Sequence, residues 1–351
     1  MRNMAISNNT IRRGIDALRK RLPDEWSVEV LSDGSRSRDA VVSIRAPDHS
    51  EVRFRTPAKV NLTGAAVRSL ITELEKAGAG EPEILVIGRF LSPLARQRLS
   101  EAKISYLDLT GNVRIRSNAP ALWIASDGAE RNPSPSQRGV RSLRGAKAGR
   151  LVRALCDRKA PTGVRELAER ATVDPGYTSR VLALLEEEDL VERGPRGEVI
   201  LVRWRDLLGL WVRDYQIGAT NRTLSCLAPL GLDSFRASLS SLRERYAVTG
   251  VDAVPSVARV LPSSRVRCYV DDPEAVMGDL GLVETDSGSN VDLIEPFDPV
   301  VYGNTHLVAD LVVVAAPQCA IDLLSGSGRE PTQGMALLDW MELNEDAWRL
   351  A

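Results

Sequence analysis

The stretch that decides the fold runs from Ala148 to Val202 and reads AGRLVRALCDRKAPTGVRELAERATVDPGYTSRVLALLEEEDLVERGPRGEVILV. Apolar residues at helical spacing predict two helices in its first half. The first covers about residues 149–158, the second begins near residue 164, and a Pro-Thr-Gly break at 161–163 separates them. The predicted inward residues are Leu151, Val152 and Leu155 in the first helix and Val164, Leu167 and Ala168 in the second.

A third helix is predicted after a tight turn at residues 171–173. Asp174 can accept a hydrogen bond from a free first-turn N–H group, and Pro175 stands where its missing N–H costs nothing. The spacing predicts a core face made of Tyr177, Val181, Leu184 and Leu185. The N-terminal end otherwise presents small or polar groups ahead of one long cation: Gly176, Thr178, Ser179 and Arg180. Such an end can approach base edges and phosphates closely.

A short β-hairpin is predicted next, with strands at about residues 189–193 and 198–202. The turn between them is Gly-Pro-Arg-Gly and places Arg196 at the tip. Three helices followed by such a hairpin resemble a winged helix-turn-helix of the IclR and MarR kind. The resemblance implies that the third helix enters a major groove of DNA. The alternative is a three-helix domain that never contacts DNA.

The charge is unevenly distributed along the 351 residues, although the net charge is only −1. Residues 206–351 hold 10 cations and 21 carboxylates, a balance of −11, which leaves 36 cations and 26 carboxylates, or +10, in residues 1–205. Pro and Ser at 133–136 mark residues 131–147 as a basic linker. Phosphate contacts are expected from Arg138, Arg141, Arg144 and Lys147. The alternative is a solvated tether.

Composition narrows the class of protein. The length predicts two or three domains, and no apolar run reaches membrane-spanning length. The four cysteines are far apart, which favours reduced core residues of a cytoplasmic protein. With only two histidines, a zinc site or a histidine-based hydrolase is not expected. We expect no metal and no cofactor.

Residues 1–130 predict an α/β domain in the order helix, three strands, helix, strand, helix, strands. This order resembles the PD-(D/E)xK nuclease-like fold, whose active members hold a divalent metal with acidic residues and a lysine. The candidate carboxylates are Asp39 and Glu51, but Arg53 stands where the resemblance requires lysine. We therefore expect an inactive domain. A metal-dependent DNA nuclease that uses these two carboxylates is the alternative function.

A second resemblance covers ILVIGRFLSPLARQRLSEAKISYLDLTGNVRIR, which is similar to a segment of AbiEi-type antitoxins. Its last part is a turn with Tyr106, Asp108, Gly111 and Asn112, where Gly-Asn tolerates positive φ and Asp108 can accept the turn's N–H groups. The resemblance implies a bacterial repressor of its own operon and a toxin encoded nearby as a partner. This chain departs from the family because its DNA-binding module lies in the middle.

Residues 204–351 predict a C-terminal α/β domain, again similar to AbiEi-like regulators and at most nucleotidyltransferase-like. The alternative function for this domain is a nucleotidyltransferase, with Thr249-Gly250 as a glycine turn and Asp271 and Asp272 as paired metal-binding acids. Asp272 precedes Pro273, however, and this pair also fits a helix cap. Asp322, Arg329 and Glu330 are expected to anchor a helix end.

The sequence thus predicts an α/β multidomain protein: a nuclease-like mixed α/β domain (1–130), a central winged helix-turn-helix (148–203) and a C-terminal α/β domain. We expect a sequence-specific DNA-binding transcription regulator, not an enzyme, that acts as a homodimer on double-stranded DNA. The residues expected nearest the bases are Tyr177, Thr178, Ser179 and Arg180, with Gly176 beside them and Arg196 on the backbone or minor groove.

Overall fold

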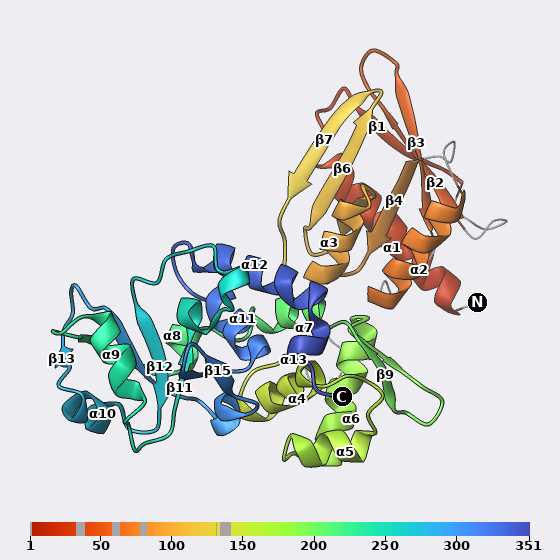
Figure 1. Ribbon diagram of the computed structural model, residues 1–351. Helices are drawn as coiled ribbons and strands as arrows, with labels where there is room; N and C mark the ends of the chain where they lie inside the picture. The colour runs from red at the N-terminus through yellow and green to blue at the C-terminus, as the bar shows by residue number, and fades with distance from the viewer. Residues whose placement is uncertain (1, 33–38, 58–63, 78–82, 131, 134–141) are drawn as a thin grey trace. The chain divides into compact units, whose positions relative to one another are not determined.

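The computed structural model describes residues 2–32, 39–57, 64–77, 83–130, 132–133 and 142–351. The chain divides into two compact units, the first formed by residues 1–139 with 186–189 and the second by residues 140–185 with 190–351. Both are mixed α/β, as expected (Figure 1). Among the described helices, none has both the length and the apolar character that a membrane crossing requires.

The first unit is built on one seven-stranded sheet in the order β1-β2-β3-β4-β5-β6-β7. The β3–β4 and β4–β5 pairs are parallel and the other pairs are antiparallel, so the sheet is mixed. The element order expected from the sequence is confirmed. The elements are α1 (Arg2–Arg19), β1 (Ser27–Ser32), β2 (Asp39–Arg45), β3 (Glu51–Pro57), α2 (Gly64–Ala77), β4 (Glu83–Gly88), α3 (Pro93–Glu101), β5 (Ser105–Asp108), β6 (Val113–Asn118) and β7 (Ala121–Ser126).

Helices cover both faces of this sheet (Figure 1). On one face Ile11, Ile15 and Leu18 of α1, spaced by a helical turn, pack on a large strand core. On the other face α2 and α3 pack on a second core that includes Tyr106. The strands at the centre are apolar on both sides because both faces are covered.

The turn between β5 and β6 has the structure that its sequence predicts. Asp108 is buried, and its carboxylate accepts hydrogen bonds from the backbone N–H groups of Thr110 (2.8 Å) and Asn112 (3.1 Å). Gly111 has φ of 107°, which favours glycine. A Cβ at Gly128 would lie 2.3 Å from the Thr110 carbonyl oxygen, so this glycine is required by close backbone approach.

The second unit contains another seven-stranded sheet, in the order β13-β10-β14-β12-β11-β16-β15, and the two-stranded hairpin β8-β9. The strands expected near residues 246, 265, 291 and 311 are confirmed. The elements before the sheet are α4 (Ala146–Asp157), α5 (Val164–Arg170), α6 (Pro175–Glu187), β8 (Val191–Arg193), β9 (Val199–Val202), α7 (Trp204–Trp211) and α8 (Ile217–Thr220).

The remaining elements form the sheet and its covering helices. They are β10 (Arg222–Leu227), α9 (Leu232–Leu239), β11 (Tyr246–Thr249), the 3₁₀ helices η1 (Gly250–Ala253) and η2 (Ser256–Ala258), β12 (Val266–Val270), α10 (Pro273–Asp279), β13 (Val283–Glu284), β14 (Val291–Glu295), η3 (Pro299–Tyr302), β15 (His306–Val308), β16 (Leu311–Val313), α11 (Ala316–Leu324), α12 (Glu330–Leu343) and α13 (Glu345–Trp348).

A buried polar cluster lies between α11 and this sheet. Asp322 is 0% exposed and accepts hydrogen bonds from Tyr215 Oη (2.7 Å), Thr249 Oγ1 (2.7 Å), Tyr269 Oη (3.0 Å) and Gln318 Nε2 (2.9 Å). Burial raises the pKa of this carboxyl, while the four donors oppose the rise. The expectation that Asp322 anchors a helix end is wrong, because Asp322 lies within α11 and three of its four partners, Tyr215, Thr249 and Tyr269, come from other segments.

The neighbouring acidic residue behaves as expected. Glu330 Oε2 accepts a hydrogen bond from the backbone N–H of Ser327 (3.0 Å) at the start of α12, and it pairs with Arg267 (2.8 Å). It therefore does hold the beginning of a helix.

Three helices and a hairpin follow one another from α4 to β9 (Figure 1). Leu151, Val152 and Leu155 of α4 are buried, as are Leu167 and Ala168 of α5. The hairpin strands are antiparallel. Thr162, between α4 and α5, exchanges two backbone hydrogen bonds with Val199 of β9 (3.0 and 2.9 Å), which ties the hairpin to the helices.

The buried face of α6 differs from the predicted one. The buried residues are Thr178, Val181, Leu182 and Leu185, at spacings of three and four, whereas Tyr177 and Leu184 are only half-buried. The prediction that Thr178 is exposed is therefore wrong. Its hydroxyl donates to the Asp174 carbonyl oxygen (3.1 Å), so the polar atom is satisfied and the small side chain can be buried.

Candidate nucleic-acid interface

The start of α6 is fixed by its first residue, by the residue before it and by the preceding turn. Asp174 Oδ1 accepts a hydrogen bond from the backbone N–H of Tyr177 (3.0 Å), as predicted for a residue that caps a helix. The helix begins at Pro175, which has no N–H to satisfy. Thr172 in the preceding turn has φ of 50° and reverses the chain between α5 and α6. These local features orient the first turn of α6.

The structure separates the five residues that the sequence placed on this edge. Gly176, Ser179 and Arg180 are exposed, Tyr177 is half-buried and Thr178 is buried. The Arg180 guanidinium carbon lies 6.0 Å from the centre of the Tyr177 ring. Partial burial raises the pKa of the Tyr177 hydroxyl, and the nearby Arg180 opposes the rise. The accessible edge therefore consists of Gly176, Tyr177, Ser179 and Arg180, with a neutral phenol beside one cation.

A surface hollow of about 500 Å³ adjoins this first turn. Cations contribute to it from two other helices, Lys147 from α4 and Arg165 from α5. Two carboxylates, Glu169 and Asp174, also line it and offset much of their charge. The other lining residues are Ala168, Thr172, Val173 and Pro175. Arg165 was missed from the sequence, where the only signal was a cation in the first turn of a short helix next to the predicted DNA-binding edge.

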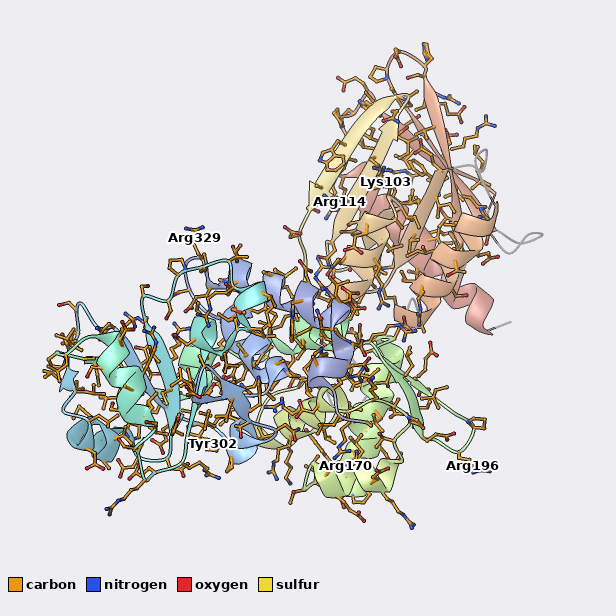
Figure 2. The ribbon with its side chains drawn as sticks, viewed as in Figure 1. Lys103, Arg114, Arg170, Arg196, Tyr302 and Arg329 are labelled. Carbon is orange, nitrogen blue, oxygen red and sulfur yellow. The ribbon has the colours of Figure 1, made fainter. Side chains whose placement is uncertain are left out.

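The hairpin turn presents Arg196 at its outer end (Figure 2). The turn is closed by backbone hydrogen bonds from Gly194 N–H to the Glu198 carbonyl (2.8 Å) and from Gly197 N–H to the Gly194 carbonyl (2.9 Å). The Glu198 carboxylate accepts from the Arg196 backbone N–H (3.0 Å), so one carboxylate lies close to the exposed cation.

Charge is polarised along α6. Lys147, Arg165, Arg180 and Arg196 are exposed, and none has an ion-pair partner within the described part of the chain. The acidic run at residues 186–189 lies at the opposite end of the 13-residue helix, about 20 Å away at 1.5 Å per residue. The positive end of the helix and the unpaired cations thus favour the same anionic ligand.

The predicted basic linker is only partly described. Arg138 and Arg141 lie outside the described residues. Arg144 pairs with Asp214 (3.2 Å), and the Leu143 backbone N–H donates to the same carboxylate (2.7 Å). This cation holds the start of the second unit in place, and much of its charge is neutralised before any ligand arrives.

The alternative nuclease site is not assembled. In the β2–β3 ladder Asp39 is opposite Pro57, whereas Glu51 is opposite Arg45, so the two carboxylates lie at opposite ends of the strand pair. Six residues of strand separate them by about 20 Å, too far for one metal ion. Each has its own partner, Arg55 for Asp39 (3.2 Å) and Arg53 for Glu51 (3.1 Å). The reading that these two carboxylates share a metal is wrong.

The alternative nucleotidyltransferase site at Asp271 and Asp272 is not assembled either, because each carboxylate has a different structural partner. Asp271 pairs with Arg245 (3.0 Å), and Asp272 Oδ1 accepts from the Ala275 backbone N–H (3.0 Å) as the cap of α10. Across the described residues, no group of three or more His, Cys, Asp or Glu side chains is arranged to hold a metal ion.

Comparison with known proteins adds no relative. No family model matches the chain, and no curated protein or solved structure matches it significantly.

Proposed function

We propose that this protein binds duplex DNA sequence-specifically through the first turn of α6. Gly176, Tyr177, Ser179 and Arg180 form the exposed edge that would meet the bases. Gly176 has no side chain to keep the helix away from a groove, and Arg180 has the reach and the planar fork that suit the acceptors of guanine. Thr178 is excluded from this set because it is buried.

The order of elements supports the same proposal. Two helices, a tight turn, a third helix and a hairpin follow in the order that the winged helix-turn-helix resemblance implies, so α6 would be the recognition helix. Lys147 and Arg165 beside the hollow suit phosphates on one side, and Arg196 suits the backbone or minor groove. Arg144 contributes less, because Asp214 already pairs with it.

One observation carries the proposal. Lys147 of α4, Arg165 of α5, Arg180 of α6 and Arg196 at the hairpin tip are exposed and have no ion-pair partner among the described residues, whereas the carboxylates of α6 lie at its other end. A helix that only packed inside a domain would have no reason to present this polarity.

Selection from a random duplex library, followed by fluorescence anisotropy at several salt concentrations, tests the proposal. We expect one enriched sequence and an affinity that falls steeply with salt. Each phosphate contact contributes about 0.9 to the slope of log K against log salt. Lys147→Ala and Arg165→Ala should each lower that slope by about one and weaken binding equally on all sequences. Arg329→Ala, a change of an exposed cation in the acidic half of the chain, serves as the control. Absence of any enriched sequence would refute the proposal.

We further propose that the protein is a bacterial transcription regulator that represses its own operon. This rests on the resemblance of the segment around Tyr106, Asp108, Gly111 and Asn112 to AbiEi-type antitoxins. In the structure Asp108 and Gly111 of this segment set the conformation of the β5–β6 turn. A promoter–reporter fusion tests repression, and co-purification with the product of the adjacent gene tests the toxin partner.

A further inference from the structure

The outer strands of the two seven-stranded sheets are protected unequally. An exposed strand edge invites pairing with another chain, so proteins shorten such strands, bend them with bulges or place charges on them. In the second unit the outer strands are β13, with two residues, and β15, with three. In the first unit β1 carries a register shift between Val30 and Ser32 and the charged Glu29. These three edges are blunted.

The fourth edge, β7, has no such protection. It has six residues, Ala-Leu-Trp-Ile-Ala-Ser, none of them charged. It pairs regularly with β6 along its whole length, from Asn118 opposite Ala121 to Val113 opposite Ser126, with no bulge. Its outer side receives no backbone hydrogen bond from any other described residue. Among the outer strands of the two described seven-stranded sheets, β7 is the one to which a further strand could pair without adjustment.

The two faces of β7 differ. Leu122 and Ile124 pack at the margin of the α1 core. On the opposite face Trp123 is 62% exposed and is flanked by the small residues Ala121 and Ala125. A large apolar ring between two alanines leaves space on either side for a second ring.

Cations from β6 line one side of this tryptophan. Arg116 is directly opposite Trp123, and the Arg114 guanidinium carbon lies 5.4 Å from the centre of the Trp123 ring. Arg114 is held there by a hydrogen bond to Ser100 Oγ (3.0 Å). Both cations therefore belong to the β6 side of Trp123, and no described strand lies on its other side.

We propose that β7 pairs antiparallel with β7 of a second copy of this chain, around a two-fold axis at Trp123. In an antiparallel pair, opposite residues point to the same face. A two-fold at Trp123 therefore sets the two indoles opposite each other, Ala121 opposite Ala125, and Leu122 opposite Ile124. A two-fold at Ile124 would instead oppose Leu122 to Ser126, whose hydroxyl already donates to the Gly111 carbonyl (2.8 Å).

Charge is compatible with this pairing. The strands themselves carry none, so no like charges oppose across the new ladder. Across the four neighbouring strands, the face that holds the indoles would carry Arg116 and Trp123 of one copy and then Trp123 and Arg116 of the second copy. Each cation would lie beside a ring. Three strand spacings of about 4.8 Å keep the two Arg116 side chains roughly 14 Å apart. That is beyond the screening length of about 8–10 Å at physiological salt.

The area sets the strength of association. A buried indole covers roughly 150–250 Å². One strand thus falls short of the roughly 800 Å² per partner of a stable interface. We therefore expect reversible dimerisation in the micromolar range in the absence of DNA, independent of whether the protein binds DNA. A dimer of this kind would present two copies of α6, as two half-sites require.

Sedimentation velocity of the full chain without DNA tests the proposal. Across the micromolar range the wild type should shift from monomer to dimer, and Trp123→Lys should remain a monomer. Leu31→Lys is the matched control, since Leu31 is an exposed apolar residue (47%) on the protected edge strand β1. A wild type that stays monomeric, or a dimer that survives Trp123→Lys, would overturn the proposal. If Trp123→Lys leaves the oligomeric state unchanged and weakens binding to single-stranded DNA, the dimer proposal is wrong and β7 contacts a nucleic acid instead.

Cysteine cross-linking tests the register without relying on the lysine variant. The four native cysteines are buried. The double variant Ala121→Cys/Ala125→Cys should form disulfide-linked dimers under mild oxidation, because each residue would be opposite the other in the second copy. Neither single variant should do so. Cross-linking by a single variant would contradict the two-fold at Trp123.

Discussion

Replacing Arg180 with alanine separates recognition from stability. Arg180 is exposed, has no ion-pair partner among the described residues, and lies with its guanidinium carbon 6.0 Å from the centre of the Tyr177 ring. Its removal leaves no buried partner unsatisfied, so the free energy of unfolding should change by no more than about 0.5 kcal/mol. The loss should appear only in DNA binding.

The size of that loss follows from the contact that Arg180 is proposed to make. A side chain that recognises a guanine contributes about 1–3 kcal/mol of discrimination. At 1.4 kcal/mol for each factor of ten, this is a roughly 5- to 150-fold fall in the affinity ratio between selected and random duplexes. The slope of log K against log salt should stay unchanged, because a base contact releases no counterion.

Fluorescence anisotropy with the selected duplex and a scrambled duplex of equal length measures both quantities. Thermal unfolding of the free variant checks that the fold is intact, and Arg329→Ala, far along the chain, should leave the ratio and the slope unchanged. If Arg180→Ala weakens both duplexes equally and lowers the slope by about one, Arg180 contacts a phosphate. If it changes neither affinity, the proposed recognition edge is wrong.

Three further outcomes are expected. The protein should not cleave plasmid DNA in magnesium or manganese through Asp39 and Glu51, because these two residues lie at opposite ends of their strand pair. Cleavage by the wild type that is lost in Asp39→Ala would contradict this. Gly128→Ala should lower the melting temperature by an amount equivalent to about 1–3 kcal/mol, because its Cβ would overlap the backbone of the adjacent turn, whereas Gly209→Ala, with open space at the Cβ, should not. Burial raises the pKa of Asp322 above its ordinary 3.8, so its contribution to stability is full below that value and declines as pH rises through the higher folded pKa. Urea unfolding of Asp322→Asn should therefore lose less stability between pH 4 and pH 7 than the wild type; equal losses would show that Asp322 is not the titrating group.

The features that the sequence predicted correctly depend on neighbouring residues. The start of α6 follows from Asp174 and Pro175, and the β5–β6 turn follows from Asp108 and Gly111. In each case the donor, the acceptor or the required backbone angle lies within four residues, so spacing alone is enough to predict the geometry.

The phase of α6 was predicted wrongly for a physical reason. An aromatic residue is usually a better core residue than a threonine, so the pattern favoured Tyr177 over Thr178. The Thr178 hydroxyl donates a hydrogen bond to the Asp174 carbonyl oxygen, which removes the usual cost of burying a polar group. This shifts the buried face by one residue and leaves Tyr177 beside Arg180.

Contacts between distant segments were beyond prediction. The partner of Arg144 is Asp214, 70 residues away, and nothing in the basic run around Arg144 indicates it. Three of the four donors around Asp322 lie outside its helix, at Tyr215, Thr249 and Tyr269, which are 53 to 107 residues away in the sequence. Sequence spacing carries no information about such pairs, because the tertiary fold alone brings them together.

Hydrogen–deuterium exchange with and without the selected duplex tests the central claim most directly. In the first turn of α6, Pro175 has no N–H and the Tyr177 N–H donates only to the side chain of the exposed Asp174, so this turn should exchange faster than the helix interior in the free protein. DNA seated on the start of α6 should slow exchange at residues 174–180 and in the hairpin turn at residues 194–197. If the duplex binds and protects other segments while residues 174–180 exchange as fast as in the free protein, α6 is not the recognition helix.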